Sequence, residues 1–530
     1  MRKKILASML AVFMTVSLLA GCGSTSSDSS DVSSTESGST TSDSYSEENP
    51  YHLTFAYVEF YEQDEAARTA VQDAMNEILI PEYHIELELL PLQYAEYQST
   101  IQLMLSGGDE LDVIPVYYTD ASSWINMGGI YDMSELLTTE DGQKIVTAIG
   151  EDNATVGTMN GVLYGFPPMK ESVELGGLAM RADICDELGI TEEFGLADQD
   201  GTYDGTYYSW DVAESIFAKV KEAYPSMTPL YMSNPSQMNR FAFFDTLSDS
   251  FGVLDWESDH SSTTVVNEYE TETYKNAVTM LARWYDSGYI YPDAATDTQG
   301  TATMMKAGNT FSYLSAIKPG FITEAEAANG CEMYSMYFGD HKEGGLASWS
   351  VNFFNTAIAS NSKDPAMAFK FISALYSDAR IMNLWQNGIE GVNYQVLEDG
   401  TAYFVDGEDS ANYKYHQGTG WFLGNQFISY VWNDGSKTPD YWEQLQAHND
   451  WAELSPAYGF MWDSSSYSTQ ITALYNALET YRAALETGSV GSANVESTLE
   501  SLNSALYAAG LQDVMDAKQA QLDEWLAAQN

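Results

Sequence analysis

The stretch HLTFAYV, residues 52–58, begins the part of the chain that decides the fold. Its apolar residues run together over the length of one strand, which predicts a buried strand. Residues 65–80 then place apolar side chains at helical spacing, and residues 85–90 alternate as a second strand. Residues 94–106 predict another helix and residues 112–117 a third strand. This order of elements predicts a parallel sheet covered by helices, which is an α/β fold.

In an open sheet of this kind, ligands bind beyond the carboxyl ends of the strands. Two of the predicted strands end next to polar and aromatic side chains. Glu59 and Gln63 follow the first strand, and Tyr118, Asp120 and Trp124 follow the third. We therefore expect these five residues to contribute to a ligand-binding site.

A second α/β unit is predicted further along the chain. A strand over residues 175–180, a helix over 209–223 and a strand over 228–233 follow a change of lobe near Phe166 to Lys170. We expect one lobe to hold residues 51–165 and about 329–360. The other lobe is expected to hold residues 166–328 and 361–530, including a helical C-terminal extension.

The length of the chain predicts the number of lobes, and its charge limits the class of ligand. The chain has 530 residues, more than one hydrophobic core usually organises, so at least two lobes are expected. Its 77 acidic and 22 basic residues give a net charge of −55. A nucleic-acid partner is excluded because no basic surface is available to replace counterions. A neutral or cationic ligand is easier to accommodate than an anionic one.

The N-terminus has the pattern of a secretion signal. Arg2, Lys3 and Lys4 precede an apolar run that is too short for a membrane span. The run ends in Leu19-Ala20-Gly21-Cys22, which resembles a bacterial lipobox. That resemblance implies cleavage after residue 21, acylation of Cys22 (palmitate being one expected chain) and a location on the extracellular face of the cytoplasmic membrane. The alternative is an ordinary cleaved signal with a chance cysteine.

Residues 22–50 are nearly all Ser, Thr, Gly and acidic residues. Such a segment cannot bury enough apolar surface to offset the entropy cost of ordering, so a disordered tether is expected.

Cys185 and Cys331 lie far apart in sequence and are expected to be free thiols. Asp198, Asp200 and Asp204 resemble the start of a calcium loop, but Ser209 stands where a Glu is needed, so an acidic turn is favoured. We expect no metal and no cofactor.

Several stretches together resemble one family, the lipoprotein solute-binding proteins of carbohydrate-type ABC importers, in the long branch with an extra C-terminal domain. The order and spacing of the stretches carry the resemblance, because each alone is short. They are LPLQYAEYQSTIQLMLSGGDELDV (90–113), NMGGIYDMSELL (126–137), NGVLYGFPPMKE (160–171), LAMRADICDELGI (178–190), NTAIASNSKDPAMAFKFISALYSDARIMNLWQNGIEGVNY (355–394), WFLGNQF (421–427) and YAAGLQDVMDAKQAQLDEWL (507–526). The chain departs from the pattern at Cys185 and at Asn393.

The resemblance implies a monomeric two-lobed clamp of type II, which closes on a sugar or oligosaccharide and delivers it to permease subunits without chemistry. A sugar site needs aromatic faces and hydrogen-bonding side chains. Further candidates are therefore the following residues: Asn234, Trp349, Glu390, Trp421, Asn425 and Gln426. No catalytic motif is evident, so no enzyme activity is expected. Two alternatives stay open: a lipid-anchored glycan hydrolase, and a binder of peptides or other small solutes on the same fold.

Overall fold

The computed structural model describes residues 45–173, 175–196, 206–232, 238–338, 345–348, 350–433, 435, 437–450 and 453–529. Cys22 and most of the expected tether lie outside these ranges, as do Asn234, Trp349 and the three aspartates of the expected acidic turn. All of the described residues fall within one compact unit, Ser42–Asn530. Among them, no helix is both long and apolar enough to cross a membrane.

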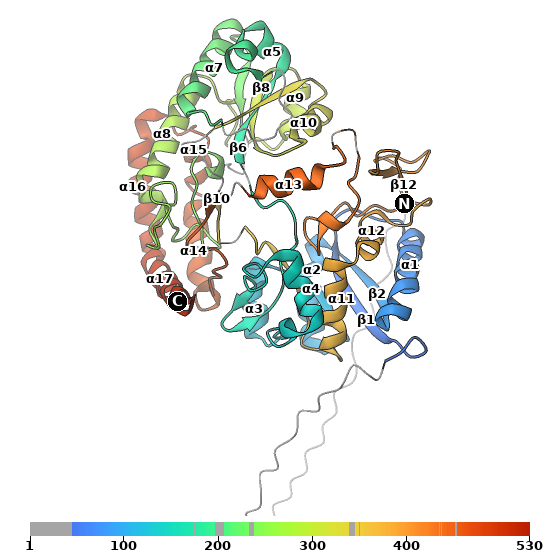
Figure 1. Ribbon diagram of the computed structural model, residues 1–530. Helices are drawn as coiled ribbons and strands as arrows, with labels where there is room; N and C mark the ends of the chain where they lie inside the picture. Colours follow the sequence, from blue (N-terminus) through green and yellow to red (C-terminus); the bar gives the residue numbers. More distant parts are fainter. Residues whose placement is uncertain are drawn as a thin grey trace, which may run out of the picture. The chain divides into compact units, whose positions relative to one another are not determined.

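The first sheet has the strand order β11-β3-β1-β2. Strands β1 (Tyr51–Glu59), β2 (Ile85–Gln93) and β3 (Val113–Tyr117) are parallel, and β11 (Phe354–Ile358) runs antiparallel to β3. The connecting helices are α1 (Glu65–Tyr83) and α2 (Tyr94–Gly107) (Figure 1). The predicted strand–helix–strand–helix–strand order is confirmed.

Both faces of this sheet are buried because alternate side chains of its strands point to opposite sides. Phe55 and Tyr57 on one face pack with α11 (Pro365–Ser377) and α12 (Ala379–Asn387). Ala56 and Val58 on the other face pack with α2 and with α3 (Tyr118–Asn126). A short helix, α4 (Glu140–Ile149), lies against α11.

The second sheet has the order β7-β8-β6-β9. Strand β6 (Leu175–Arg181) is antiparallel to both β8 (Thr310–Ile317) and β9 (Met333–Tyr337), and β7 (Thr228–Tyr231) is parallel to β8. The other helices of this region are α5 (Ala182–Glu187), α6 (Ile190–Phe194), α7 (Trp210–Ala223), α8 (Glu272–Asp286), α9 (Thr301–Lys306) and α10 (Phe321–Asn329). The predicted strand at 175–180 and helix at 209–223 are therefore present.

The C-terminal helices complete the core of the second sheet. Leucines at helical spacing, including Leu474, Leu502 and Leu522, are buried in the same cluster as Phe217 and Trp284. The helices are α14 (Ser468–Leu478), α15 (Arg482–Glu486), α16 (Val495–Ala508) and α17 (Leu511–Gln529). The predicted helical C-terminal extension is therefore present and packs through its leucines, whereas Tyr475 of α14 is 42% exposed.

The course of the chain differs from expectation in two places. Strand β9 was expected in the first lobe but pairs with β6 of the second sheet. Residues 365–387 were expected in the second lobe, but α11 and α12 bury Phe371 and Trp385 against β1. Amphipathic elements of this kind fit either core by pattern alone, so side-chain shape decides between the two.

Four more short strands and one further helix lie outside the two four-stranded sheets. They are β10 (Gly345–Leu346), β14 (Glu453–Leu454), β12 (Tyr394–Val396), β13 (Ala402–Phe404) and α13 (Tyr441–Asn449). Strand β10 pairs with β14, and β12 pairs with β13.

Residues 45–50 were expected in the tether, but Tyr45 packs edge-on against Tyr51 with ring centroids 5.3 Å apart. Residues 45–50 therefore belong to the described fold and not to the tether, because Tyr45 packs against the core of the first sheet.

Candidate functional site

Aromatic side chains gather at one edge of the first sheet. Parallel strands β1, β2 and β3 end at this edge, and antiparallel β11 begins there. We call the cluster the aromatic edge; it consists of Phe60, Tyr61, Tyr94, Tyr117, Tyr118, Phe353 and Trp421. This is the edge at which the sequence rule for open sheets predicts a ligand, and the structure gathers aromatic side chains there.

The rings of the aromatic edge support one another without being fully covered. The ring centroids of Phe60 and Trp421 are 5.0 Å apart, and those of Tyr117 and Phe353 are also 5.0 Å apart. Tyr94 lies 5.9 Å from Phe60 and is 60% exposed. Rings held by edge-to-face and tilted contacts keep a fixed orientation. The edge therefore presents flat apolar faces to solvent.

Two of the predicted aromatic residues, Tyr118 and Trp421, belong to this edge, and a third does not. Trp124 of α3 is 1% exposed. Its ring lies in the core, where its centroid is 6.4 Å from that of Tyr97 of α2. As α3 continues away from the edge, its apolar face turns into the core. The structure thus gives Trp124 a packing role.

Two predicted polar residues near the end of β1 are engaged in internal contacts. The carboxylate of Glu59 accepts a hydrogen bond of 2.9 Å from Arg68 of α1. Burial raises the pKa of Glu59, and the charge of Arg68 opposes that rise. The Gln63 amide accepts from the backbone N–H of His416 and donates to the carbonyl oxygen of the same residue. Both side chains fix the loops that follow β1.

Asp120 lies half a turn beyond Tyr118 in α3 and is buried, with its Oδ1 accepting a hydrogen bond from Gln98 of α2. Burial raises its pKa from 3.8 to about 6, and the amide of Gln98 opposes that rise. Among the described residues no cation forms an ion pair with this carboxylate. Asp120 is therefore a strong acceptor beside the aromatic edge, suited to a hydroxyl donor.

A second group of polar residues lies where the chain passes from the first sheet to the second. We call it the charged junction; it consists of Lys170, Glu171, Lys318 and Gln426. Glu171 accepts hydrogen bonds from Lys318 Nζ at 3.2 Å and from Gln426 Nε2 at 3.0 Å. Burial alone would raise the Glu171 pKa, but Lys318, Lys170 and the Gln426 amide lower it to about 2. The predicted residue Gln426 is thus part of an ion-pair network.

Two other predicted residues do not face either region. Asn425 accepts a hydrogen bond from the backbone N–H of Phe427 and so begins a single turn of 3-10 helix, Gln426–Ile428. Glu390 is exposed in the loop between α12 and β12. Among the described residues, no group of three or more His, Cys, Asp or Glu side chains could hold a metal ion.

The structure brings one further aromatic residue, Tyr475 of α14, near the aromatic edge. Asn126 at the end of α3 donates a hydrogen bond of 3.1 Å to Ser465, just before α14. Burial is the main cause that raises the pKa of Tyr118, and the nearby Tyr475 hydroxyl adds to it. Tyr475 of α14 therefore lies near Tyr117 and Tyr118 of the aromatic edge.

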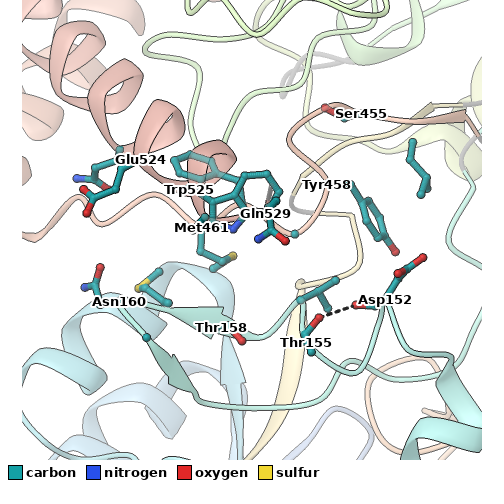
Figure 2. A pocket seen from close by; sticks show the side chains of 18 residues that line it. Asp152, Thr155, Thr158, Asn160, Ser455, Tyr458, Met461, Glu524, Trp525 and Gln529 are labelled. Carbon is teal, nitrogen blue, oxygen red and sulfur yellow. Dashed lines mark hydrogen bonds between the residues drawn. The ribbon is translucent and has the colours of Figure 1, made fainter. Parts of the chain in front are cut away.

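A pocket of about 760 Å³ lies between the first lobe and the last helix (Figure 2). Its lining comes from the β4–β5 hairpin (Thr158–Met159 and Val162–Leu163) with the loop before it, from residues 454–461, and from α17. Trp525 points from α17 toward the hairpin, and Tyr458 points toward Asp152 (Figure 2). None of the residues selected from the sequence lines this pocket.

The two thiols of the described part of the chain are free, as expected. Cys185 is buried, and burial raises its pKa to about 12, so it stays protonated at neutral pH. Cys331 is half-buried. Neither thiol contributes to the aromatic edge or to the pocket.

Comparison with known proteins agrees with the architecture of two α/β regions and a helical C-terminal region. An N-glycan transport solute binding protein from Streptococcus pneumoniae has a TM-score of 0.73 at 20% identity, covering 91% of this chain and 100% of that one. The same protein in complex with Man5GlcNAc has a TM-score of 0.61 at 20% identity, covering 91% and 99%. The fold is therefore that of the two-lobed solute-binding proteins.

Sequence comparison identifies the family. The model described as bacterial extracellular solute-binding protein matches residues 73–403, which is more than half of the chain. The protein belongs to that family. Residues 456–527 match a second model, described as a domain of unknown function. A relative named carbohydrate ABC transporter substrate-binding protein, from Streptococcus pneumoniae serotype 4, is 24% identical over 460 residues, which is 85% of this chain and 87% of the relative.

Proposed function

We propose that this protein captures a neutral oligosaccharide outside the cell and delivers it to the permease of an ABC importer. The aromatic edge is the observation that carries the proposal. The C–H faces of a sugar ring pack against flat aromatic faces, and its hydroxyls need hydrogen-bonding partners such as Asp120. The names of the relative and of the structural neighbours, which include a glycan complex, support a carbohydrate as the ligand.

Capture proceeds by closure of the two lobes in this proposal. A ligand first lies on the aromatic edge and then gains contacts from the opposing lobe, and only those additional contacts can shift the equilibrium toward the closed form. Tyr475 is placed to supply one of them. Capture breaks no covalent bond, so the proposal requires no metal, no cofactor and no catalytic residue.

The overall charge supports a neutral ligand. The chain carries a net charge of −55, and among the described residues no basic side chain belongs to the aromatic edge. An anionic glycan would be repelled at long range and would find no partner at the edge.

Substitution of Trp421 tests the site. We expect Trp421→Ala to weaken binding of a responsive neutral oligosaccharide by roughly 10- to 100-fold, because a stacking face of about 1.5–3 kcal/mol is lost. Calorimetry on a panel of neutral oligosaccharides, with peptides as the second ligand class, provides the measurement. Tyr507→Ala is the control, since Tyr507 is 38% exposed on α16 and bonds Glu270.

Three results would contradict the proposal. They are equal affinity in the Trp421→Ala and Tyr507→Ala variants, binding of peptides but of no glycan, and release of shortened sugars after incubation with the protein. The last result would instead identify a glycan hydrolase.

We further propose that Cys22 anchors the protein to the outer face of the cytoplasmic membrane. The lipobox-like residues 19–22 support acylation, and two or more acyl chains hold a protein stably on a bilayer. We expect Cys22→Ser to release the chain into the medium and to abolish incorporation of labelled palmitate. Retention of both the label and the membrane fraction in this variant would exclude the anchor.

A further inference from the structure

The pocket between the β4–β5 hairpin and α17 shares no lining residue with the aromatic edge. Its volume of about 760 Å³ falls within the usual range of ligand pockets, about 300–1,000 Å³. One wall is a helix face, because Gln521, Trp525 and Gln529 follow one another at intervals of four residues on α17. The floor is the hairpin with Met159, and Tyr458 closes one side.

One side of this pocket is formed by a segment of chain that contacts with both cores hold in place. Residues 455–463, which we call the strip, run between the two cores: Met461 is buried in the core of the first sheet, and Phe460 and Trp462 in that of the second. The carboxylate of Asp463 accepts hydrogen bonds from Asn126 at 3.3 Å and from Asn160 at 3.1 Å.

Contacts at both ends of the strip complete the frame. The Gln521 amide bonds both the N–H and the carbonyl oxygen of Asp463, and the Tyr458 hydroxyl donates a hydrogen bond of 2.7 Å to Asn153. A site whose walls are already fixed loses little entropy when a ligand binds. The pocket is therefore pre-formed.

Trp525 supplies the main recognition surface. Its ring packs edge-on against Phe460, with centroids 5.9 Å apart and planes at 69°, so its orientation is fixed. The ring is half-exposed and projects into the pocket (Figure 2). Among the described residues its indole N–H has no hydrogen-bond acceptor. A flat apolar face next to an unused donor suits a sugar ring, which carries C–H faces and hydroxyl groups.

The charge of the lining narrows the ligand class. The eighteen residues drawn in Figure 2 include the acids Asp152 and Glu524 and no Lys, Arg or His. An anion entering the pocket would therefore be repelled and would find no cationic partner. Carboxylates, the Gln529 amide and the Thr158 hydroxyl offer acceptors and donors to neutral hydroxyl groups.

We propose that the pocket between the β4–β5 hairpin and α17 is a second carbohydrate-binding site, for a neutral sugar unit, separate from the aromatic edge. The proposal shares its ligand class with the proposed function and rests on it in that respect. It assigns a role to the C-terminal helices beyond core packing, since α17 forms one wall of the site.

The test counts sites on the mature full-length chain by calorimetry and by equilibrium dialysis. The probes are neutral trisaccharides of glucose, mannose and N-acetylglucosamine, a galacturonate trisaccharide as the anionic control, and glucosamine as the cationic control. Ala528→Trp is the principal variant, because Ala528 is exposed, lines the pocket and can be enlarged without disturbing the core. Trp525→Ala is the second variant, and Trp421→Ala reports on the aromatic edge.

We expect two sugar molecules per chain at saturation for at least one neutral trisaccharide. Ala528→Trp and Trp525→Ala should each reduce the count to one, with an affinity change of less than about twofold at the remaining site. Trp421→Ala should weaken binding of the other molecule by roughly 10- to 100-fold. The galacturonate trisaccharide should not bind the pocket.

A single site that Trp421→Ala weakens and Ala528→Trp leaves unchanged would overturn this proposal and leave the proposed function standing. Binding of galacturonate or of glucosamine that Ala528→Trp removes, without binding of a neutral sugar there, would overturn the assigned ligand class. Absence of sugar binding at both sites would overturn the proposed function as well.

Discussion

The aromatic edge and the charged junction lie on neighbouring parts of the molecule but use their side chains in opposite ways. Rings of the aromatic edge touch one another and leave faces exposed, as in Tyr94 at 60%. In the charged junction, Glu171 bonds Lys318 and Gln426. A partnered polar group has little left to offer a ligand, whereas a supported ring still has a free face.

The comparison shows which of the predicted residues are better candidates for contacting a ligand. In a chain this acidic, cations and amides near a carboxylate tend to be engaged with it, and Arg68, Lys318 and Gln426 are. Asp120 differs from Glu59 and Glu171 because its one described polar partner is the neutral amide of Gln98 and not a cation. The edge therefore combines free ring faces with one carboxylate that is not ion-paired among the described residues.

The largest effect is expected at the charged junction. Glu171→Ala removes the carboxylate that Lys318 and Gln426 bond, and should cost about 2 kcal/mol of unfolding free energy at pH 7, less than for a fully buried pair. Urea unfolding monitored by fluorescence measures it. Glu171→Gln is the matched control, since it keeps the side-chain volume and removes only the charge.

The pH dependence at Glu171 has a definite sign. Its pKa in the folded protein is lowered from 4.5 to about 2, so its contribution is complete above about pH 5. That contribution is lost as the pH falls toward 2, because the unfolded chain then binds the proton first. The stability gap between wild type and Glu171→Ala should shrink over this range. A gap that stays constant down to pH 2.5 would show that the ion pair is not its origin.

A smaller effect on the unfolding free energy, of opposite sign, is expected at Asp120, beside the aromatic edge. Burial raises the Asp120 pKa from 3.8 to about 6, so its ionised form destabilises the fold above pH 6 and has no such effect below 3.8. Asp120→Asn should therefore raise the unfolding free energy by about 1–2 kcal/mol at pH 7.5 and leave it unchanged at pH 3.5. The same variant should weaken sugar binding several-fold at pH 7.5. Equal stability at pH 7.5 would contradict this account.

The smallest effect is expected at Tyr475 of α14, which lies near Tyr117 and Tyr118 of the aromatic edge. Tyr475→Ala should weaken binding of a long oligosaccharide by about three- to tenfold, or about 1 kcal/mol, and leave a disaccharide unaffected. Tyr475→Phe keeps the ring and should bind normally if stacking is the contact. Equal losses for short and long ligands would instead indicate a change in the packing of α14 on Phe251, whose ring centroid lies 4.8 Å away.

Local pattern predicted the elements of the first sheet well. The alternation and helical spacing of residues 52–117 fix β1 to β3 and the helices between them, because these signals depend on near neighbours in the chain. The rule that ligands bind beyond strand ends then led to Tyr118 and Asp120. The same rule included Trp124, which the continuation of α3 carries into the core.

Residues that depend on distant partners were harder to assign. Gln63 bonds His416, and Gln426 bonds Glu171, across more than 250 residues of sequence. Tyr475 occupies a position at the apolar helical spacing of α14, and yet its side chain is 42% exposed. In each case the sequence gives the residue type, and its neighbours in space decide the role.

By itself, the sequence determined the α/β class, the acidic character and the elements of the first sheet, since these follow from composition and short-range periodicity. The family resemblance came from the order and spacing of several matching stretches. The tertiary structure decided that β9 joins the second sheet, that α11 and α12 cover the first, and that α17 forms one wall of the pocket with Trp525. The physical reason is that packing depends on the shapes of surfaces brought together from far apart in the chain, which no local pattern encodes.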